Sequence, residues 1–295
     1  MKIISALSQL LTEHPKAVIT EYQLGQLIYQ LYRSKEYRGK KLLLSKPNAD
    51  SGVYNRILKR LIASDVLDTS RRLPNQVLAI LDHELPDETV TACAADPFAY
   101  ISHHSAMEYH GLAMKKSDAL YLTSPNPKMW RERAEQTMRV DLRQNYDGYL
   151  ASGLPRLARI RLDKIGRSRV QRHSPQQLGD WIFDPEKTIA ITTIGQTFLD
   201  ILRYPEWSGG MKHVLRIIDK FGAHHLDEIV RVLNTSGTNI DKVRFGYLFN
   251  ERLNISNTAI DNWVRFAQRG GSRKLDPTAE YKPVWSEKWC LSLNI

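Results

Sequence analysis

The chain has 295 residues, enough for two ordinary domains, and its 42% hydrophobic and 25% charged residues are typical of a folded protein. No stretch approaches the roughly 20 apolar residues that a transmembrane helix needs, and two cysteines are too few for a disulfide framework. We therefore expect a cytoplasmic protein that does not enter a membrane.

The formal net charge is +10, and it is unevenly distributed. Residues 1–85 contain 13 Lys and Arg residues but 8 Asp and Glu residues, so under a third of the chain carries half of the excess. This asymmetry favours a polyanionic partner, such as nucleic acid, for the N-terminal part. A basic surface that only keeps the protein in solution is the alternative.

Three helices followed by a hairpin are predicted within residues 1–85. The opening "MKIISALSQLLTEHPK" has helical apolar spacing and no small-residue cleavage site, which indicates a helix rather than a signal peptide. Thr20 is a plausible N-cap for the second helix, and Asp50 or Ser51 for the third. The extended stretches "DVLDT" and "QVLAIL" flank the turn-like "SRRLPN". Such an order is typical of a winged helix-turn-helix domain.

The third helix separates an apolar side from a basic side. At 100° per residue, one stripe contains Tyr54, Ile57, Leu58, Leu61 and Ile62. Outside that stripe lie Asn55, Arg56, Lys59 and Arg60. Because an α-helix fits the major groove, where Arg pairs with guanine and Asn with adenine, this helix is predicted to bind DNA.

The predicted DNA interface extends beyond the basic side of the third helix. Lys59 and the wing residues Arg71 and Arg72 are expected to contact phosphates, which position a protein without reading sequence. Ser51, at the start of the helix, and Lys40 and Lys41, in the basic segment before it, complete the set. An amphipathic helix with a merely solvated basic face is the alternative.

Residues 86–97, "PDETVTACAADP", are acidic and small, with proline at both ends, and are predicted to be a linker. Residues 98–295 form the predicted second domain. There "ALYLTS", "MRVDL", "LARIRLDKI" and "TIAITTI" are strand-like, and helical spacing prevails from Thr197 onward. The expected fold is α+β: an N-terminal winged helix, then a mixed α/β domain whose second half resembles a helical bundle.

The histidine-rich segment "ISHHSAMEYHG" at 101–111 contains the residue types of a metal site. His103 and His110 lie two helical turns apart, about 10 Å along the axis, so one ion cannot bind both from the same helix. His104 and Glu108 lack further ligands in any neighbouring motif. A helix that packs through its histidines and ends at Gly111 is therefore predicted.

Other catalytic motifs are missing from the sequence. "FDPEKTIAI" superficially resembles a metal-dependent nuclease core, but Glu186 and Lys187 are adjacent and would point to opposite faces of a strand. Phosphate-binding, dinucleotide-binding and nucleophile-elbow motifs do not occur. We predict no catalytic residues, no metal and no cofactor. A nucleic-acid-modifying enzyme assembled from scattered residues stays open, as does a pure interaction protein.

Four stretches, in order over roughly residues 97–295, resemble the AbiEi-like antitoxins of AbiE type IV toxin–antitoxin systems. The first is "YISHHSAMEYHGL", close to the family's Tyr-Ile/Val-Ser-His-x-Ser-Ala-Leu-x-x-His-Gly-Leu. The others are "TTIGQTFLDILRYPEWSGG", "VRFGYLFNERL" and "KLDPTAEYKPVWSEKWCLSLN". The sequence departs from the family in its basic insert "YRSKEYRGKKLLLSK" and in lacking a Gly-rich wing.

The resemblance implies a function that the residues alone do not give. Such antitoxins bind inverted repeats upstream of their own operon through a winged helix and repress it. They counteract a nucleotidyltransferase-like toxin without a stable complex, in systems linked to abortive infection and phage defence. A stand-alone transcriptional regulator on the same scaffold is the alternative.

Overall fold

A computed structural model describes the chain except residues 70–72, 85–86, 114 and 270–272. The chain divides into two compact units. Unit 1 comprises residues 1–99 and 124–176, and unit 2 comprises residues 100–123 and 177–295. These units differ from the predicted ranges 1–85, 86–97 and 98–295, because the chain leaves unit 1 and later returns to it.

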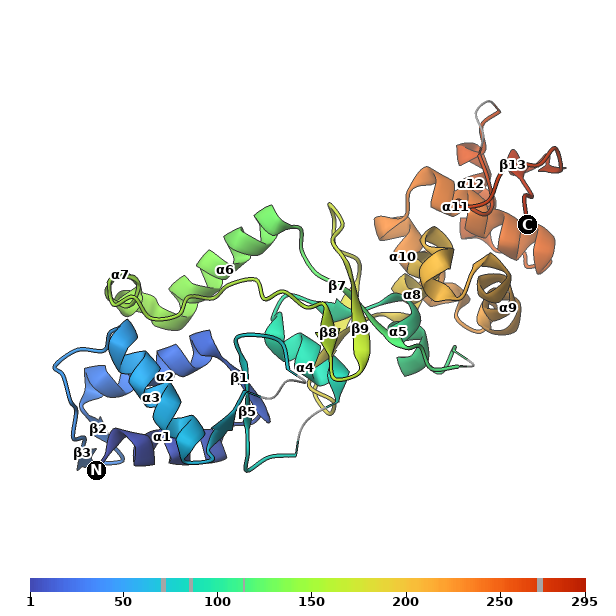
Figure 1. Ribbon diagram of the computed structural model, residues 1–295. Helices are drawn as coiled ribbons and strands as arrows, with labels where there is room; N and C mark the ends of the chain where they lie inside the picture. The colour runs from blue at the N-terminus through green and yellow to red at the C-terminus, as the bar shows by residue number, and fades with distance from the viewer. Residues whose placement is uncertain (70–72, 85–86, 114, 270–272) are drawn as a thin grey trace. The chain divides into compact units, whose positions relative to one another are not determined.

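The first part of unit 1 alternates helices and short strands (Figure 1). In chain order these are α1 (Ile3–Thr12), β1 (Val18–Thr20), α2 (Glu21–Ser34), β2 (Glu36–Tyr37), β3 (Lys40–Lys41), α3 (Ser51–Ala63), β4 (Leu67–Asp68) and β5 (Val77–Ile80). β5 pairs with β1 and with β4, antiparallel in both cases. The three helices and the two later strands agree with the sequence prediction, whereas β1 was not predicted.

Capping side chains set where α2 begins. Thr20 Oγ1 accepts a hydrogen bond from the Gln23 backbone N–H at 3.3 Å, and the Gln23 side chain accepts one from the Thr20 N–H at 2.9 Å. This reciprocal capping box satisfies two backbone donors that have no partner within the helix. The predicted N-cap at Thr20 is therefore confirmed.

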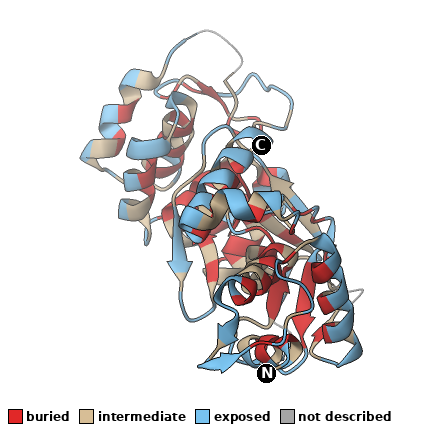
Figure 2. Cartoon of the chain, turned by 90° about the vertical axis from the view of Figure 1, so that its left-hand side faces the viewer, coloured by how far each residue is buried: buried red, intermediate tan, exposed pale blue. Residues whose placement is uncertain are grey.

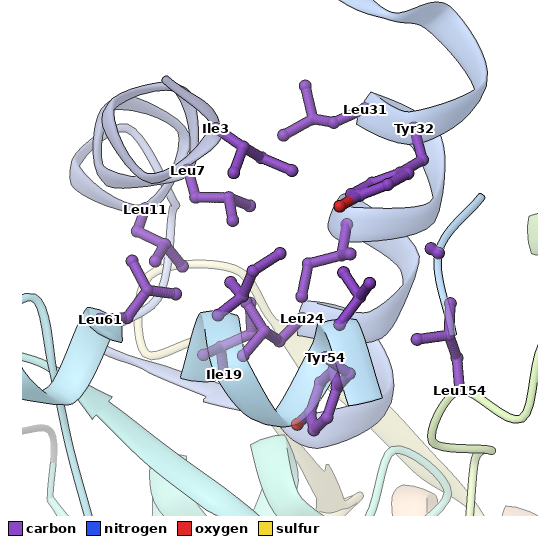
Figure 3. Packing of buried hydrophobic residues seen from close by; sticks show 14 of the residues in the cluster. Ile3, Leu7, Leu11, Ile19, Leu24, Leu31, Tyr32, Tyr54, Leu61 and Leu154 are labelled. Atoms are coloured by element: carbon purple, nitrogen blue, oxygen red, sulfur yellow. The ribbon is translucent and has the colours of Figure 1, made fainter. Parts of the chain in front are cut away.

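The core of unit 1 gathers the apolar faces of its first three helices (Figure 3). It includes Ile3, Leu7 and Leu11 from α1, Leu24, Ile28 and Leu31 from α2, and Tyr54, Ile57 and Leu61 from α3. Ile19 of β1 and Ile80 of β5 also belong to it. Opposite these buried stripes, the helices expose polar residues (Figure 2).

The second part of unit 1 consists of α4 (Glu88–Ala95), α6 (Pro127–Leu142), the 3₁₀ turn η1 (Arg143–Asn145), α7 (Tyr146–Ala151), β8 (Lys164–Ile165) and β9 (Ser168–His173). α4 occupies the predicted linker and contacts β1. "MRVDL", predicted as a strand, lies in α6. Met138 and Leu142 are buried one helical turn apart, and Val140 between them is 72% exposed. Burial therefore follows the period of a helix through this segment, and the predicted strand is wrong. Of "LARIRLDKI", only Lys164 and Ile165 form a strand.

α6 and α7 belong to unit 1 because they pack on α2. Tyr149 of α7 is fully buried and makes edge-on ring contacts with Tyr22 and Tyr29 of α2. The Tyr22 hydroxyl donates to Asp141 of α6 at 3.0 Å. Contacts across more than a hundred residues of sequence therefore complete the first core.

Asp96, at the end of α4, joins four segments of unit 1. Its buried carboxylate accepts hydrogen bonds from Ser124 Oγ at 2.6 Å and from the Trp130 indole N–H of α6 at 2.9 Å. The Arg172 guanidinium of β9 lies 3.8 Å away. A buried charge is tolerated when donors replace its lost water, as they do here.

Unit 2 opens with strands and continues with helices. Its strands β6 (Tyr100–Ile101), β7 (Ala119–Thr123), β10 (Trp181–Asp184) and β11 (Ile189–Thr192) lie in the order β10-β11-β6-β7, and α5 (His103–Tyr109) connects β6 to β7. The helical part contains α8 (Ile194–Arg203), the 3₁₀ turn η2 (Pro205–Ser208), α9 (Met211–Phe221), α10 (Leu226–Ser236), α11 (Asn239–Gly246), the π-helical η3 (Tyr247–Arg252), α12 (Thr258–Trp263) and the 3₁₀ turn η4 (Val264–Phe266). β12 (Trp285–Ser286) and β13 (Leu291–Ser292) close the chain as a hairpin.

Contacts of the C-terminal residues 276–294 with α11 and with one another complete unit 2. The α11 backbone at Gly246 lies against the indole of the fully buried Trp289, where a Cβ would overlap the ring. The Asn294 side chain donates to the carbonyl of Asp276 at 2.9 Å and accepts from its N–H at 2.9 Å. The contact of Gly246 with Trp289 places the last of the four family-like stretches against α11, and the bonds between Asp276 and Asn294 join the two ends of that stretch. The chain as a whole has a mixed α and β fold, as predicted.

Within the described residues, no helix combines the length and the apolar character that crossing a membrane requires.

Replacing Asp96 by alanine should strongly destabilise the fold, because Ser124 and Trp130 would keep buried donors without an acceptor. We expect the free energy of unfolding to fall by roughly 3 kcal/mol. Urea denaturation measures this loss, with Asp118→Ala as a control, because Asp118 is an exposed carboxylate. Equal stability of the two variants would contradict the joining role of Asp96.

Candidate nucleic-acid interface

α3 begins at Ser51 because Asp50 caps it. The Asp50 carboxylate accepts a hydrogen bond from the Val53 N–H at 2.7 Å, and its second oxygen accepts from Lys46 Nζ at 2.6 Å. The hydrogen bond from Lys46 and those from the helix backbone lower the pKa of Asp50. A negative cap also complements the positive end of the helix dipole.

The two faces of α3 are those predicted from the sequence. Val53, Tyr54, Ile57 and Leu61 are buried, and Leu58 and Ile62 are half-buried. Ser51, Asn55, Arg56, Lys59 and Arg60 are all exposed. Burial of the apolar stripe therefore orients Asn55, Arg56, Lys59 and Arg60 away from the core, over more than a turn of helix.

The basic side chains of α3 are not neutralised within the described part of the chain. Arg56 Nη1 donates to Ser45 Oγ at 3.4 Å, a long contact with an uncharged group. Among the described residues, no carboxylate lies within 4.0 Å of the charged groups of Arg56, Lys59 or Arg60. These cations are therefore free to contact an external anion.

Lys40 and Lys41 lie on a separate element, the β2–β3 hairpin. Both are exposed, and they pair with Tyr37 and Glu36 across the hairpin. Its two turn residues, Arg38 and Gly39, both have positive φ, as a tight two-residue hairpin turn requires. Arg71 and Arg72, the predicted wing arginines, lie outside the described residues.

Positive charge is concentrated in unit 1. Unit 1 contains 25 Lys and Arg residues and 16 Asp and Glu residues, a net charge of +9, whereas unit 2 contains 17 and 16, a net charge of +1. Residues 1–85, from which a polyanionic partner was predicted, carry only +5 of this charge. Residues 156–172 contain seven Lys and Arg residues and one Asp, and a charge count carried past residue 85 finds them.

The histidines of 101–111 make structural contacts inside unit 2. His103 is fully buried, with Nδ1 2.8 Å from Ser102 Oγ. His110 Nε2 donates to the Thr192 carbonyl at 2.8 Å, and His104 lies 3.0 Å from the Glu108 carboxylate within α5. The packing and hydrogen bonding predicted for His103 and His110 are confirmed. Within the described residues, no three His, Cys, Asp or Glu side chains are grouped to hold a metal ion.

No family model matches the chain, and no curated protein matches it. Among solved structures, the chain is similar to the RV2827C protein from Mycobacterium tuberculosis, with 14% sequence identity and a TM-score of 0.50. The similarity covers 97% of this chain and 89% of that one. At this identity the likeness concerns the fold alone.

Replacing His110 by alanine should lower stability through the lost bond to Thr192, by about 1–3 kcal/mol. Burial lowers the pKa of His110, so the folded protein binds a proton there less readily than the unfolded chain. The stability of the wild type should therefore decrease as pH falls below about 6.5, and the variant should lose part of this dependence.

Urea denaturation between pH 5 and 8 measures both effects, with the exposed His224→Ala as the matched control. DNA affinity should stay near that of the wild type. Zinc bound to the wild type would contradict the structural role of His110. So would a variant that loses DNA affinity while its stability equals that of the wild type.

Proposed function

We propose that the chain is a DNA-binding transcriptional repressor and the antitoxin of a type IV toxin–antitoxin system. One observation carries the DNA-binding part: α3 exposes Asn55, Arg56, Lys59 and Arg60 on the face opposite the core, in the unit that holds +9 of the +10 net charge. Exposed cations without a carboxylate partner can contact phosphates, and exposed Arg and Asn side chains can contact base edges.

The element order supports a winged helix as the form of this domain. Three helices, a strand between the first two, and the antiparallel pair β4–β5 after the third follow the usual order of that motif. α3 is then the recognition helix. Arg56, Arg60 and Asn55 are assigned to base edges. Phosphate contacts are assigned to Lys59, Lys40, Lys41, Arg71 and Arg72, and Ser51 to the end of the helix that enters the groove.

The antitoxin part rests on the family resemblance of residues 97–295. Residues of those four stretches contact one another or their surroundings: His110 bonds Thr192, Gly246 lies against Trp289, and Asp276 bonds Asn294. This supports interpreting the stretches as the framework of one domain. We propose that this domain counteracts a nucleotidyltransferase-like toxin, and that the N-terminal domain binds inverted repeats in the promoter of the operon.

The experiment compares single alanine variants on DNA from upstream of the gene, with every base of the bound site substituted in turn. Arg56→Ala or Arg60→Ala should relax the preference at one base pair, at a cost of about 1–3 kcal/mol, because a bidentate contact is lost. Lys59→Ala should weaken binding to all sequences alike.

Lys128→Ala is the control, because Lys128 is an exposed lysine of unit 1 on a different helix. Equal, sequence-independent losses from all three α3 variants would remove the assignment of α3 to base reading. Binding of wild-type protein with no sequence preference would overturn the repressor proposal.

A further inference from the structure

An extended segment of unit 1 carries the largest local charge in the chain. Residues 154–173, here called the basic strap, follow α7, run without regular structure to β8 and end with β9 (Figure 1). Their basic residues are Arg156, Arg159, Arg161, Lys164, Arg167, Arg169 and Arg172, and their one acidic residue is Asp163. The net charge is +6 in the strap and +5 in residues 1–85, so the rest of the chain has a net charge of −1.

The apolar residues of the strap anchor it to unit 1. Leu154, Ile160, Leu162 and Ile165 are all buried. Glu88 of α4 accepts hydrogen bonds from the backbone N–H of Arg167 and from the Ser168 hydroxyl. Arg172 turns inward and donates to the Ile160 carbonyl at 2.9 Å. Fixed contacts at both ends of the basic run limit how far its side chains can move.

Five of the other six basic side chains of the strap face solvent, whereas Arg159 is half-buried and donates to Ser174 Oγ at 2.9 Å. Arg156, Arg161, Lys164, Arg167 and Arg169 are exposed, and they alternate with the buried residues in the manner of an extended chain. Arg161 pairs with Asp163 at 2.6 Å, with both side chains well exposed, an arrangement that contributes little to stability. In the part of the chain that the structure describes, Arg156, Lys164, Arg167 and Arg169 have no carboxylate within 4.0 Å.

The strap starts beside the end of α3 that is proposed to enter the groove. A Cβ at Gly153 would lie 4.0 Å from Ser51 Cβ, an ordinary van der Waals contact. From Gly153 to Lys164 an extended chain reaches at most roughly 36–40 Å. One turn of B-DNA rises about 34 Å, so the strap is long enough to follow the duplex for up to a full turn.

We propose that the basic strap contacts the phosphate backbone of the duplex that α3 binds, which makes it a second DNA-binding surface. This inference rests on the proposed function and adds a surface to it. Cationic side chains at extended-chain spacing match a line of phosphates. The exposed side of the strap offers charge with little apolar area, which suits a polyanion better than a protein partner.

The test removes three strap charges in the full-length protein, as Lys164→Ala/Arg167→Ala/Arg169→Ala. Affinity for upstream DNA and for a scrambled duplex is measured against salt concentration. Three lost phosphate contacts should reduce the slope of log K against log salt by about 2.7 and lower the affinity on the order of a hundredfold at 0.1 M salt. Both duplexes should be affected alike, so the base preference set by α3 stays unchanged.

Two controls separate phosphate contact from net charge and from misfolding. Lys212→Ala/Arg216→Ala/Lys220→Ala removes the same charge from exposed positions of α9 in unit 2 and should leave the slope unchanged. Arg167→Lys/Arg169→Lys keeps the charge and should bind nearly as the wild type does. Melting temperatures of all variants exclude unfolding as the cause.

An unchanged slope in the strap variant, or an equal loss in the α9 variant, would overturn the proposal. A loss confined to a structured RNA, with duplex DNA binding intact, would overturn it too and assign the strap to RNA. If Arg56→Ala relaxes base preference while the strap variant binds normally, the strap proposal is wrong and the repressor proposal stands. If the wild type shows no base preference, the repressor proposal is wrong. The change in salt slope of the strap variant then still tests whether the strap contacts phosphates.

Discussion

Burial of Tyr54, Ile57 and Leu61 against α1, α2 and the sheet fixes the rotation of α3 about its own axis. A helix cannot turn these residues inward without turning Asn55, Arg56, Lys59 and Arg60 outward, because the two sets lie on opposite sides of one cylinder. The same apolar contacts that stabilise unit 1 therefore present its basic face. The Asp50 cap sets where that face begins.

In the second part of unit 1, Asp96 fixes the positions of several segments relative to one another. Its carboxylate holds the end of α4, the segment at Ser124 and the start of α6 together, and it approaches Arg172 of the strap. Within the strap, Arg172 points inward while Arg167 and Arg169 point outward. Arg172 thus helps to fix β9, the strand that also contains the exposed Arg169. The strap is therefore anchored by buried groups of unit 1, while its exposed residues add to the positive charge of that unit.

Elements that depend on neighbouring residues could be predicted from the sequence. Elements that depend on contacts between residues far apart in the chain could not. Thr20 and the stripe of α3 could be identified because caps and helical spacing act within a few residues. "MRVDL" alternates like a strand, and only the longer spacing of Trp130, Ala134, Met138 and Leu142 reveals α6. The return of residues 124–176 to unit 1 depends on contacts such as Tyr22 with Asp141, which no local pattern encodes. The basic strap was not predicted as part of the interface, because its basic residues lie more than 70 positions beyond residue 85 and join unit 1 only in the folded chain.

The proposed repressor function requires that unit 1 bind DNA through charge and through base sequence. The most direct measurement is the affinity of the wild-type protein for DNA upstream of its own gene and for a scrambled duplex of equal length, titrated with salt. We expect log K to fall linearly with log salt for both duplexes, and we expect a preference for the upstream DNA that random competitor DNA does not remove. Weak binding, equal for the two duplexes at every salt concentration, would contradict the proposed function.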